Sequence, residues 1–164
     1  MQAEQKRFLE KRYGAREWYG YTKHGRRVVK DFSLDKWEIP GWTPQRVERN
    51  ELAKPPTIRS LWRRGESTTQ LLAIDMFECA SVKAAHDQLI EAFGNIESDA
   101  VERRTGKNSP GDVAFALDDT MVLFARANLV ALIRNVGPKV VRVGKIAREL
   151  DRLLLRRLES KPPA

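Results

Sequence analysis

The chain has 164 residues, of which 41% are hydrophobic and 32% are charged, and its formal net charge at pH 7 is +8. This length suits one domain with a core of its own, and the apolar content excludes a disordered chain. No apolar run approaches the roughly 20 residues of a membrane-spanning helix. The single cysteine, Cys79, excludes an internal disulfide.

The first 54 residues predict an extended, irregular arm that packs on the rest of the chain. Within it, residues 2–13 favour a short helix and residues 26–34 favour a strand. The stretch that follows carries tryptophans and prolines and ends at Pro55–Pro56, a pattern typical of irregular chain. We therefore expect an α+β domain over residues 55–164, with residues 1–54 as its arm.

The secondary-structure patterns are clearer after Pro55–Pro56. The side chains of residues 57–65 alternate between two faces, with Ile58, Ser60 and Trp62 on one and Arg59, Leu61 and Arg63 on the other. Residues 70–79 form a long apolar run, so the two stretches predict an antiparallel hairpin. Ser81 is a candidate N-cap for an amphipathic helix over about 82–96. After a possible short strand, residues 109–135 predict a three-stranded meander with two turns, which we interpret as sheet core.

The last predicted element is a helix over about 143–158. Leucine-rich positions form a wide apolar stripe along it, and Arg148, Arg152 and Arg156 form a second stripe at four-residue spacing. The expected fold is therefore α+β, with an antiparallel sheet covered by two helices, about 82–96 and 143–158, and an extended irregular N-terminal arm.

Three fragments carry a resemblance to a known family: "SPGDVAFAL", "VLFARANLVALIRN" and "VGKIARELDRLL". They resemble the pattern of small exported bacterial α/β domains of the PsbP-like type. In that pattern a Gly-Asp pair opens a strand, an arginine-containing turn joins two strands, and an Ala-Arg…Leu-Asp helix ends the domain. The match covers residues 70–158 loosely and 109–158 better. The turn usually reads Arg-Gly-Asn in that pattern, where this chain has Arg126-Ala127-Asn128.

This resemblance implies a non-catalytic accessory or binding domain of the bacterial cell envelope, with an unknown ligand or protein partner. It carries no catalytic residue to this chain. The sequence contains no Walker loop, no glycine-rich dinucleotide fingerprint and no Gly-x-Ser-x-Gly elbow, and it has only two histidines. We therefore expect no enzyme activity, no cofactor and no metal.

The basic surplus lies at the two ends of the chain and suggests an alternative function, a nucleic-acid- or anion-binding protein. Aromatic rings beside cations stack on bases and bind phosphates, but they serve equally to pack an arm onto a sheet. The candidate anion or ligand surface comprises Trp18, Tyr19, Tyr21, Arg26, Arg27, Arg148, Arg152 and Arg156.

A remote alternative is a small thiol enzyme that uses Cys79. This cysteine precedes a predicted helix start, where backbone amides lower thiol pKa values. His86, the nearest candidate base, follows about two helical turns later, roughly 10 Å along the axis at ~1.5 Å per residue. A buried structural cysteine is the favoured interpretation.

The compartment depends on processing. "MQAEQKRFLEKRYG" at the start of the chain is polar and lacks the apolar core of a secretory signal. We expect the periplasm or cell envelope if a signal peptide was removed, and the cytoplasm otherwise.

Overall fold

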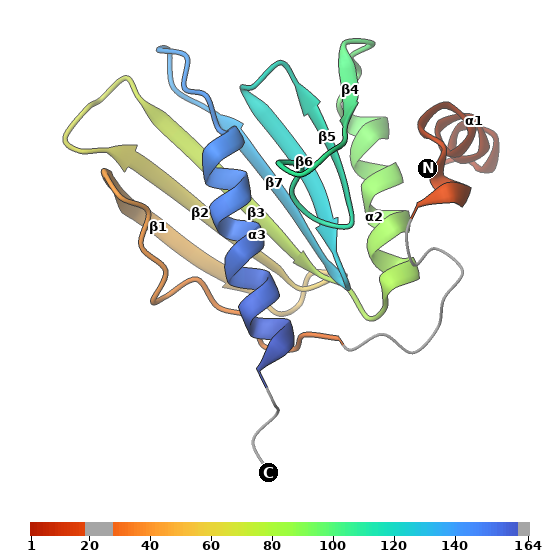
Figure 1. Cartoon of the computed structure of the whole chain (residues 1–164), viewed down its shortest axis with the longest axis horizontal. Helices are drawn as coiled ribbons and strands as arrows, with labels where there is room; N and C mark the ends of the chain where they lie inside the picture. The colour runs from red at the N-terminus through yellow and green to blue at the C-terminus, as the bar shows by residue number, and fades with distance from the viewer. Residues whose placement is uncertain (19–27, 161–164) are drawn as a thin grey trace.

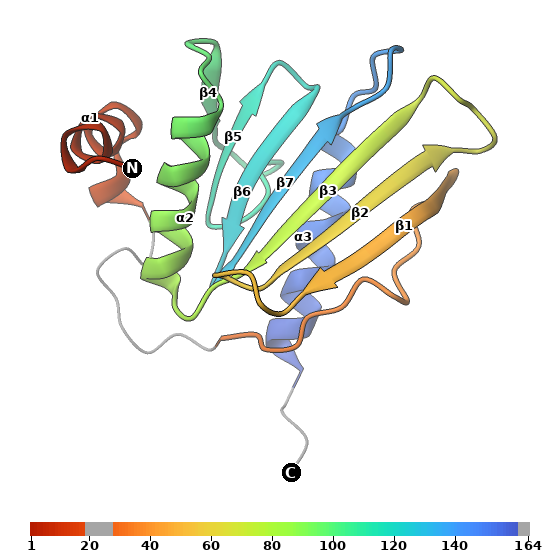
Figure 2. The ribbon, with the colours of Figure 1, turned by 180° about the vertical axis from the view of Figure 1, so that it is seen from behind.

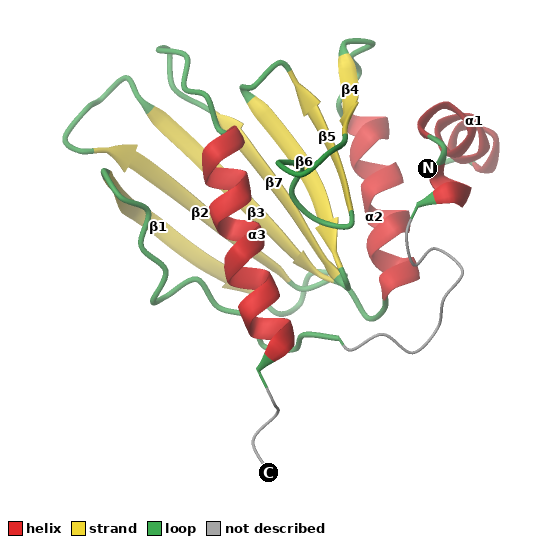
Figure 3. Ribbon diagram, viewed as in Figure 1, coloured by secondary structure: helices red, strands yellow, loops and turns green. Residues whose placement is uncertain are grey.

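The computed structural model of the chain describes residues 1–18 and 28–160. All strand pairs are antiparallel, and they form one seven-stranded sheet in the order β1-β2-β3-β7-β6-β5-β4 (Figures 1 and 3). The α+β class with an antiparallel sheet is therefore confirmed. In chain order the elements are α1 (Ala3–Tyr13), η1 (Ala15–Glu17), β1 (Trp42–Asn50), β2 (Thr57–Arg64), β3 (Leu71–Glu78), α2 (Val82–Asn95), β4 (Val101–Arg104), β5 (Val113–Leu117), β6 (Met121–Arg126), β7 (Leu129–Asn135) and α3 (Gly144–Glu159).

The sheet joins two meanders. Strands β1, β2 and β3 follow one another in space as they do in the chain, and so do β4, β5, β6 and β7. The β2–β3 hairpin and the β5–β6–β7 meander match the sequence predictions. The two meanders meet where β3 pairs with β7, with Leu72 opposite Asn135 and Glu78 opposite Leu129.

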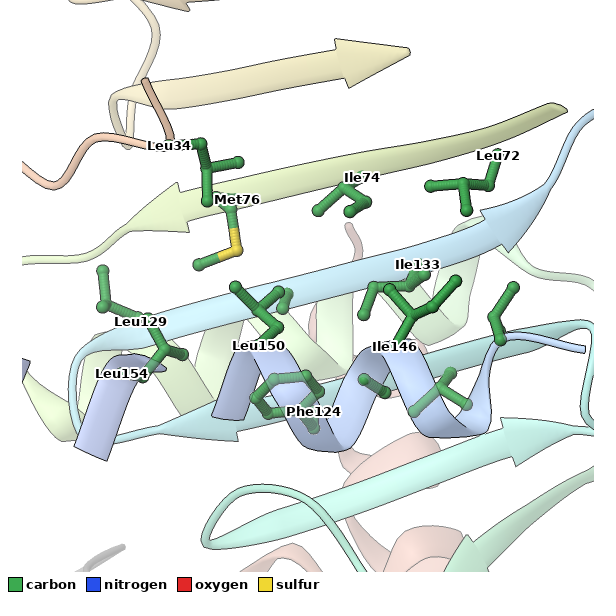
Figure 4. Packing of buried hydrophobic residues seen from close by; sticks show 14 of the residues in the cluster. Leu34, Leu72, Ile74, Met76, Phe124, Leu129, Ile133, Ile146, Leu150 and Leu154 are labelled. Atoms are coloured by element: carbon green, nitrogen blue, oxygen red, sulfur yellow. The ribbon is translucent and has the colours of Figure 1, made fainter. Parts of the chain in front are cut away.

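Side chains alternate between the two faces of the sheet, and each face has its own core. In β5, Ala114 and Ala116 belong to the core that contains α3, whereas Val113 and Phe115 belong to the core that contains α2. Figure 4 shows the first core, where α3 packs on β3, β6 and β7. Its labelled residues are Leu34, Leu72, Ile74, Met76, Phe124, Leu129, Ile133, Ile146, Leu150 and Leu154.

Residues 28–41 complete the cover on the α3 side without forming a helix or a strand. Val29, Phe32, Leu34 and Ile39 are buried in the same core as α3. Backbone N–H groups of Asp31 and Phe32 donate to the Glu78 carboxylate at 3.0 and 2.9 Å. The strand predicted over 26–34 is therefore absent from its described part, residues 28–34, which pack as irregular chain.

The predicted irregular arm is also wrong for Trp42–Asn50, which forms β1 at one edge of the sheet. Pro44 interrupts the pattern, and the register with β2 shifts between Pro44 and Arg46. An edge strand tolerates a proline and a bulge because one row of its backbone groups needs no strand partner. Most side chains of β1 are exposed, so the strand lacks the apolar alternation that marks a buried one.

Helix α2 begins as predicted, with the Ser81 hydroxyl accepting a 3.0 Å hydrogen bond from the Ala84 backbone N–H. It contacts β6 and β7 on the face opposite α3. Helix α1 lies against α2. The ring of Tyr13, the last residue of α1, stacks on Phe93 of α2 with 4.1 Å between ring centroids.

A buried ion-pair network links the turn between β6 and β7 to α3 and to the start of β5. The Arg126 guanidinium donates to both oxygens of Asp151 at 2.8 Å and to Asp112 Oδ1 at 3.0 Å. The other oxygen of Asp112 accepts from the Ala127 backbone N–H at 2.8 Å. This bond helps to hold Ala127 at φ 51°, a left-handed conformation that costs a residue with a Cβ about 1–2 kcal/mol.

The neighbouring Asn128 ties three segments together from a position that is almost fully buried. Its side-chain oxygen accepts from the Val29 N–H at 2.7 Å, and its amide donates to the carbonyls of Val29 and Cys79 at 2.8 Å. Apart from Arg134, whose side chain is half exposed, residues 109–135 therefore serve core packing and structural hydrogen bonds, as the sequence predicted.

We expect the Arg126→Met substitution to lower the free energy of unfolding by about 3–5 kcal/mol, because it leaves two buried carboxylates without their cation. Urea denaturation followed by circular dichroism measures the loss. Arg152→Met, at an exposed position of α3, is the matched control and changes the stability by less than about 0.5 kcal/mol. Equal stability of the two variants would show that the network does not hold the fold together.

Candidate functional site

The structure places Trp18 in the core. Its side chain is 2% exposed, its indole N–H donates to the Tyr13 carbonyl at 2.9 Å, and its ring lies 5.5 Å from those of Phe115 and His86. A ring in this position packs the start of the chain onto α2 and cannot stack on a ligand. The other candidates from this segment, Tyr19, Tyr21, Arg26 and Arg27, lie outside the described residues.

The predicted arginine stripe lies on α3. Arg152 and Arg156 are exposed, and Arg148 is half-buried. Arg148 lines a pocket of about 170 Å³ together with Arg104 and the Asp119 carboxylate. That carboxylate lies beside Gly144, the first residue of α3, so it already occupies the positive end of the helix dipole.

Cys79 and His86 are both buried. Burial, together with the nearby negative charges of Asp87 and Glu78, raises the pKa of the Cys79 thiol from 9.0 to about 12. The thiol is therefore protonated at neutral pH, and this counts against the alternative of a thiol enzyme.

Two further features bear on possible chemistry. Within residues 1–18 and 28–160, no group of three or more His, Cys, Asp or Glu side chains is arranged to hold a metal ion. None of the helices described is both long enough and apolar enough to cross a membrane.

The most distinctive surface lies on β1, β2, β3 and β7, on the side away from α3. Figure 2 shows these strands from that side, with α3 behind them. On this side α2 contacts β6 and β7, and no other described element covers β1, β2 and β3. We call this surface the open face; its side chains are Arg46, Glu48, Arg59, Leu61, Arg63, Ala73, Asp75 and Arg134.

The strand register sets these side chains in rows across the sheet. One row runs through Glu48, Arg59 and Asp75, and the next runs through Arg46, Leu61, Ala73 and Arg134. Both rows line a hollow of about 280 Å³.

A second hollow of about 300 Å³, towards the β1–β2 turn, shares Glu48 and Arg59 with the first. The two hollows therefore adjoin each other on the open face.

Asp75 lies at the centre of the charged groups of the open face. Its side chain is buried, and its carboxylate lies between the guanidinium groups of Arg59, at 3.7 Å, and Arg134, at 3.8 Å. These two arginine side chains are 70% and 49% exposed. Burial raises the pKa of Asp75, and this effect outweighs the opposing attraction of both arginines. The ionised carboxylate thus costs stability while it holds two exposed cations in place.

The sequence predicted the strand face that carries three of the eight side chains of the open face, but it did not predict a site there. The alternation in "TIRSLWRRG" placed Arg59, Leu61 and Arg63 on one side of a strand. The contributions of Asp75 and Arg134 were missed, because they come from strands whose register the sequence does not give. One signal was available: Asp75 is the only charged residue inside the apolar run 70–77.

Comparison of the chain with protein-family models, curated proteins and solved structures finds no match in any of the three. The resemblance to PsbP-like domains therefore stays a prediction. The chemistry of the open face rests on the residues that form it.

We expect the Cys79 thiol to react with iodoacetamide at pH 8 roughly a thousandfold more slowly in the folded chain than in guanidinium chloride. The difference in pKa lowers the thiolate fraction by about this factor, and burial slows the reaction further. Mass spectrometry of timed samples measures both rates. Equal rates would restore the thiol-enzyme alternative.

We expect Asp75→Asn to raise the free energy of unfolding at pH 7. A carboxyl group whose pKa is higher in the folded than in the unfolded state stabilises the fold most when protonated, and this contribution is lost as the pH rises through the folded pKa. The advantage of the amide therefore shrinks as the pH falls towards 4. Urea denaturation across this range measures it, with the exposed Asp35→Asn as the control. A variant less stable than the parent at pH 7 would contradict the assignment.

Proposed function

We propose that this chain is a non-catalytic binding module that receives a protein partner on the open face. One observation carries the proposal. Strands β5, β6 and β7 are covered on both faces of the sheet, whereas no described residues cover β1, β2 and β3 on the face away from α3. A sheet of this kind buries one face and leaves the other for solvent or for a partner.

The composition of the open face supports a partner rather than solvent alone. Leu61 and Ala73 are half-buried at its centre, and arginines stand around them. Arginine is enriched at protein interfaces because its planar guanidinium both stacks and forms several hydrogen bonds. A surface that only faces water has no need of a buried, destabilising carboxylate at its centre, and the cost of Asp75 is typical of functional sites.

The proposal includes the setting that the resemblance implies, an accessory role in the bacterial cell envelope. The alternative of a nucleic-acid- or anion-binding protein has less support, since it calls for exposed aromatic rings beside its cations and Trp18 is in the core.

Site-specific photocrosslinking tests the proposal. A benzophenone amino acid at position 61 of this protein, in the cells that produce it, is expected to give one discrete adduct with another protein. The same group at position 152, on exposed α3, is the matched control and gives no such adduct. Arg134→Glu is expected to remove the adduct from position 61. No adduct at 61, or the same adducts from both positions, would overturn the proposal.

A further inference from the structure

We infer that the open face binds an acidic amphipathic helix of the partner, laid over β2 and β3 beside α2. This inference rests on the proposed function and specifies the partner. Three features of the described residues lead to it. They are the position next to α2 that a second helix could occupy on the sheet, the apolar side chains at the centre of the open face, and the sign of the charges around them.

The sheet has room for a second helix next to α2. Strands in a sheet lie about 4.8 Å apart, and neighbouring helices on a sheet lie about 10 Å apart, so each helix covers two strands. Helix α2 covers β6 and β7. In the strand order of this sheet the next helix position lies over β3 and β2, where the described chain supplies no helix.

The open face has an apolar pair at its centre. Leu61 and Ala73 are directly opposite each other on β2 and β3. Asp75 and Arg134 lie next to this pair, and beyond them Phe77 and Leu132 are half-buried and pack against the core that contains α2. A second helix with one apolar side would extend this core across the open face.

The charges select the sign of the partner. The open face carries four arginines and two carboxylates, and each carboxylate already has an arginine partner. Arg46 pairs with Glu48 at 2.6 Å, and Asp75 lies between two arginines. The surplus is positive, and the side chains of Arg59 and Arg134 are 70% and 49% exposed. A partner with Glu or Asp along one side complements it.

The edge strand argues for a helix rather than an added strand. Pairing of a new strand with β1 would need a regular row of backbone groups along its free edge. Pro44 and the irregular register beside it interrupt that strand, as edge strands that avoid pairing commonly do. The partner therefore lies on the face of the sheet and not on its edge.

The probe is a fluorescein-labelled 18-residue peptide with leucines along one side of a helix and glutamates along the other. Its controls are a scrambled peptide of the same composition and a peptide with lysine in place of every glutamate. Fluorescence anisotropy with the full-length chain is expected to show binding of the first peptide and not of the controls. Binding is expected to weaken with added salt.

Variants locate the binding. Arg59→Ala with Arg134→Ala is expected to weaken binding about tenfold, and Leu61→Asp is expected to abolish it. Arg59→Lys keeps the charge and most of the affinity. Arg152→Ala with Arg156→Ala, on the other face, is the matched control and leaves binding unchanged. Thermal melts followed by circular dichroism establish that each variant is folded. We expect folding to be retained because the substituted side chains are exposed or half-buried.

The outcomes separate this inference from the proposed function. A position-61 adduct without binding of the acidic helix overturns the inference and leaves the proposed function standing. Preference for the lysine peptide, or an unchanged affinity in the double arginine variant, also overturns the inference. Tighter binding of a single-stranded oligonucleotide that depends on Arg59 and Arg134 overturns both.

Discussion

The half-buried guanidinium of Arg126 joins the segments on which the rest of the structure is arranged. It binds carboxylates from two of them, Asp112 before β5 and Asp151 in α3, beside a turn in which Ala127 has a positive φ. Two residues on, Asn128 fixes residue 29 and the junction between β3 and α2. One turn therefore sets the positions of α3, of the irregular segment 28–41 and of the start of α2. These positions decide which parts of the sheet are covered and leave the open face without a helix.

The elements that the sequence predicted well are those whose side chains are sorted by burial. The strands of the C-terminal half and both long helices have clear apolar periodicity, and Ser81 marks the start of α2. Strand β1 was missed because Pro44 and its exposed side chains resemble a loop. The segment 28–34 was predicted as a strand because its valines and Phe32 are buried, although they pack without pairing. The alternation in β2 predicted the strand that carries Arg59, Leu61 and Arg63 but not a site, because only the register brings Asp75 and Arg134 beside them.

The fragments that resemble the PsbP-like pattern meet at one place in the structure. The Gly-Asp pair, the arginine turn and the Leu-Asp of the last helix supply Asp112, Arg126 and Asp151 to the same network. Gly111 lies next to this network, where a Cβ would come within 2.4 Å of the Ala125 carbonyl oxygen. The pattern thus describes residues that hold the chain together, and the open face lies outside all three fragments except for Arg134.

The pairing of β3 with β7 has a consequence for how the chain folds. Each meander consists of hairpins between strands that follow one another in the sequence, and such local contacts form in microseconds. Residue 72 pairs with residue 135 across a stretch of chain that contains α2 and the whole second meander. Closing this large loop is the slow step that contact order imposes on sheets of this kind. The newly synthesised chain therefore carries an unpaired β3 edge until β7 leaves the ribosome, and that edge is where misassembly with another copy would start.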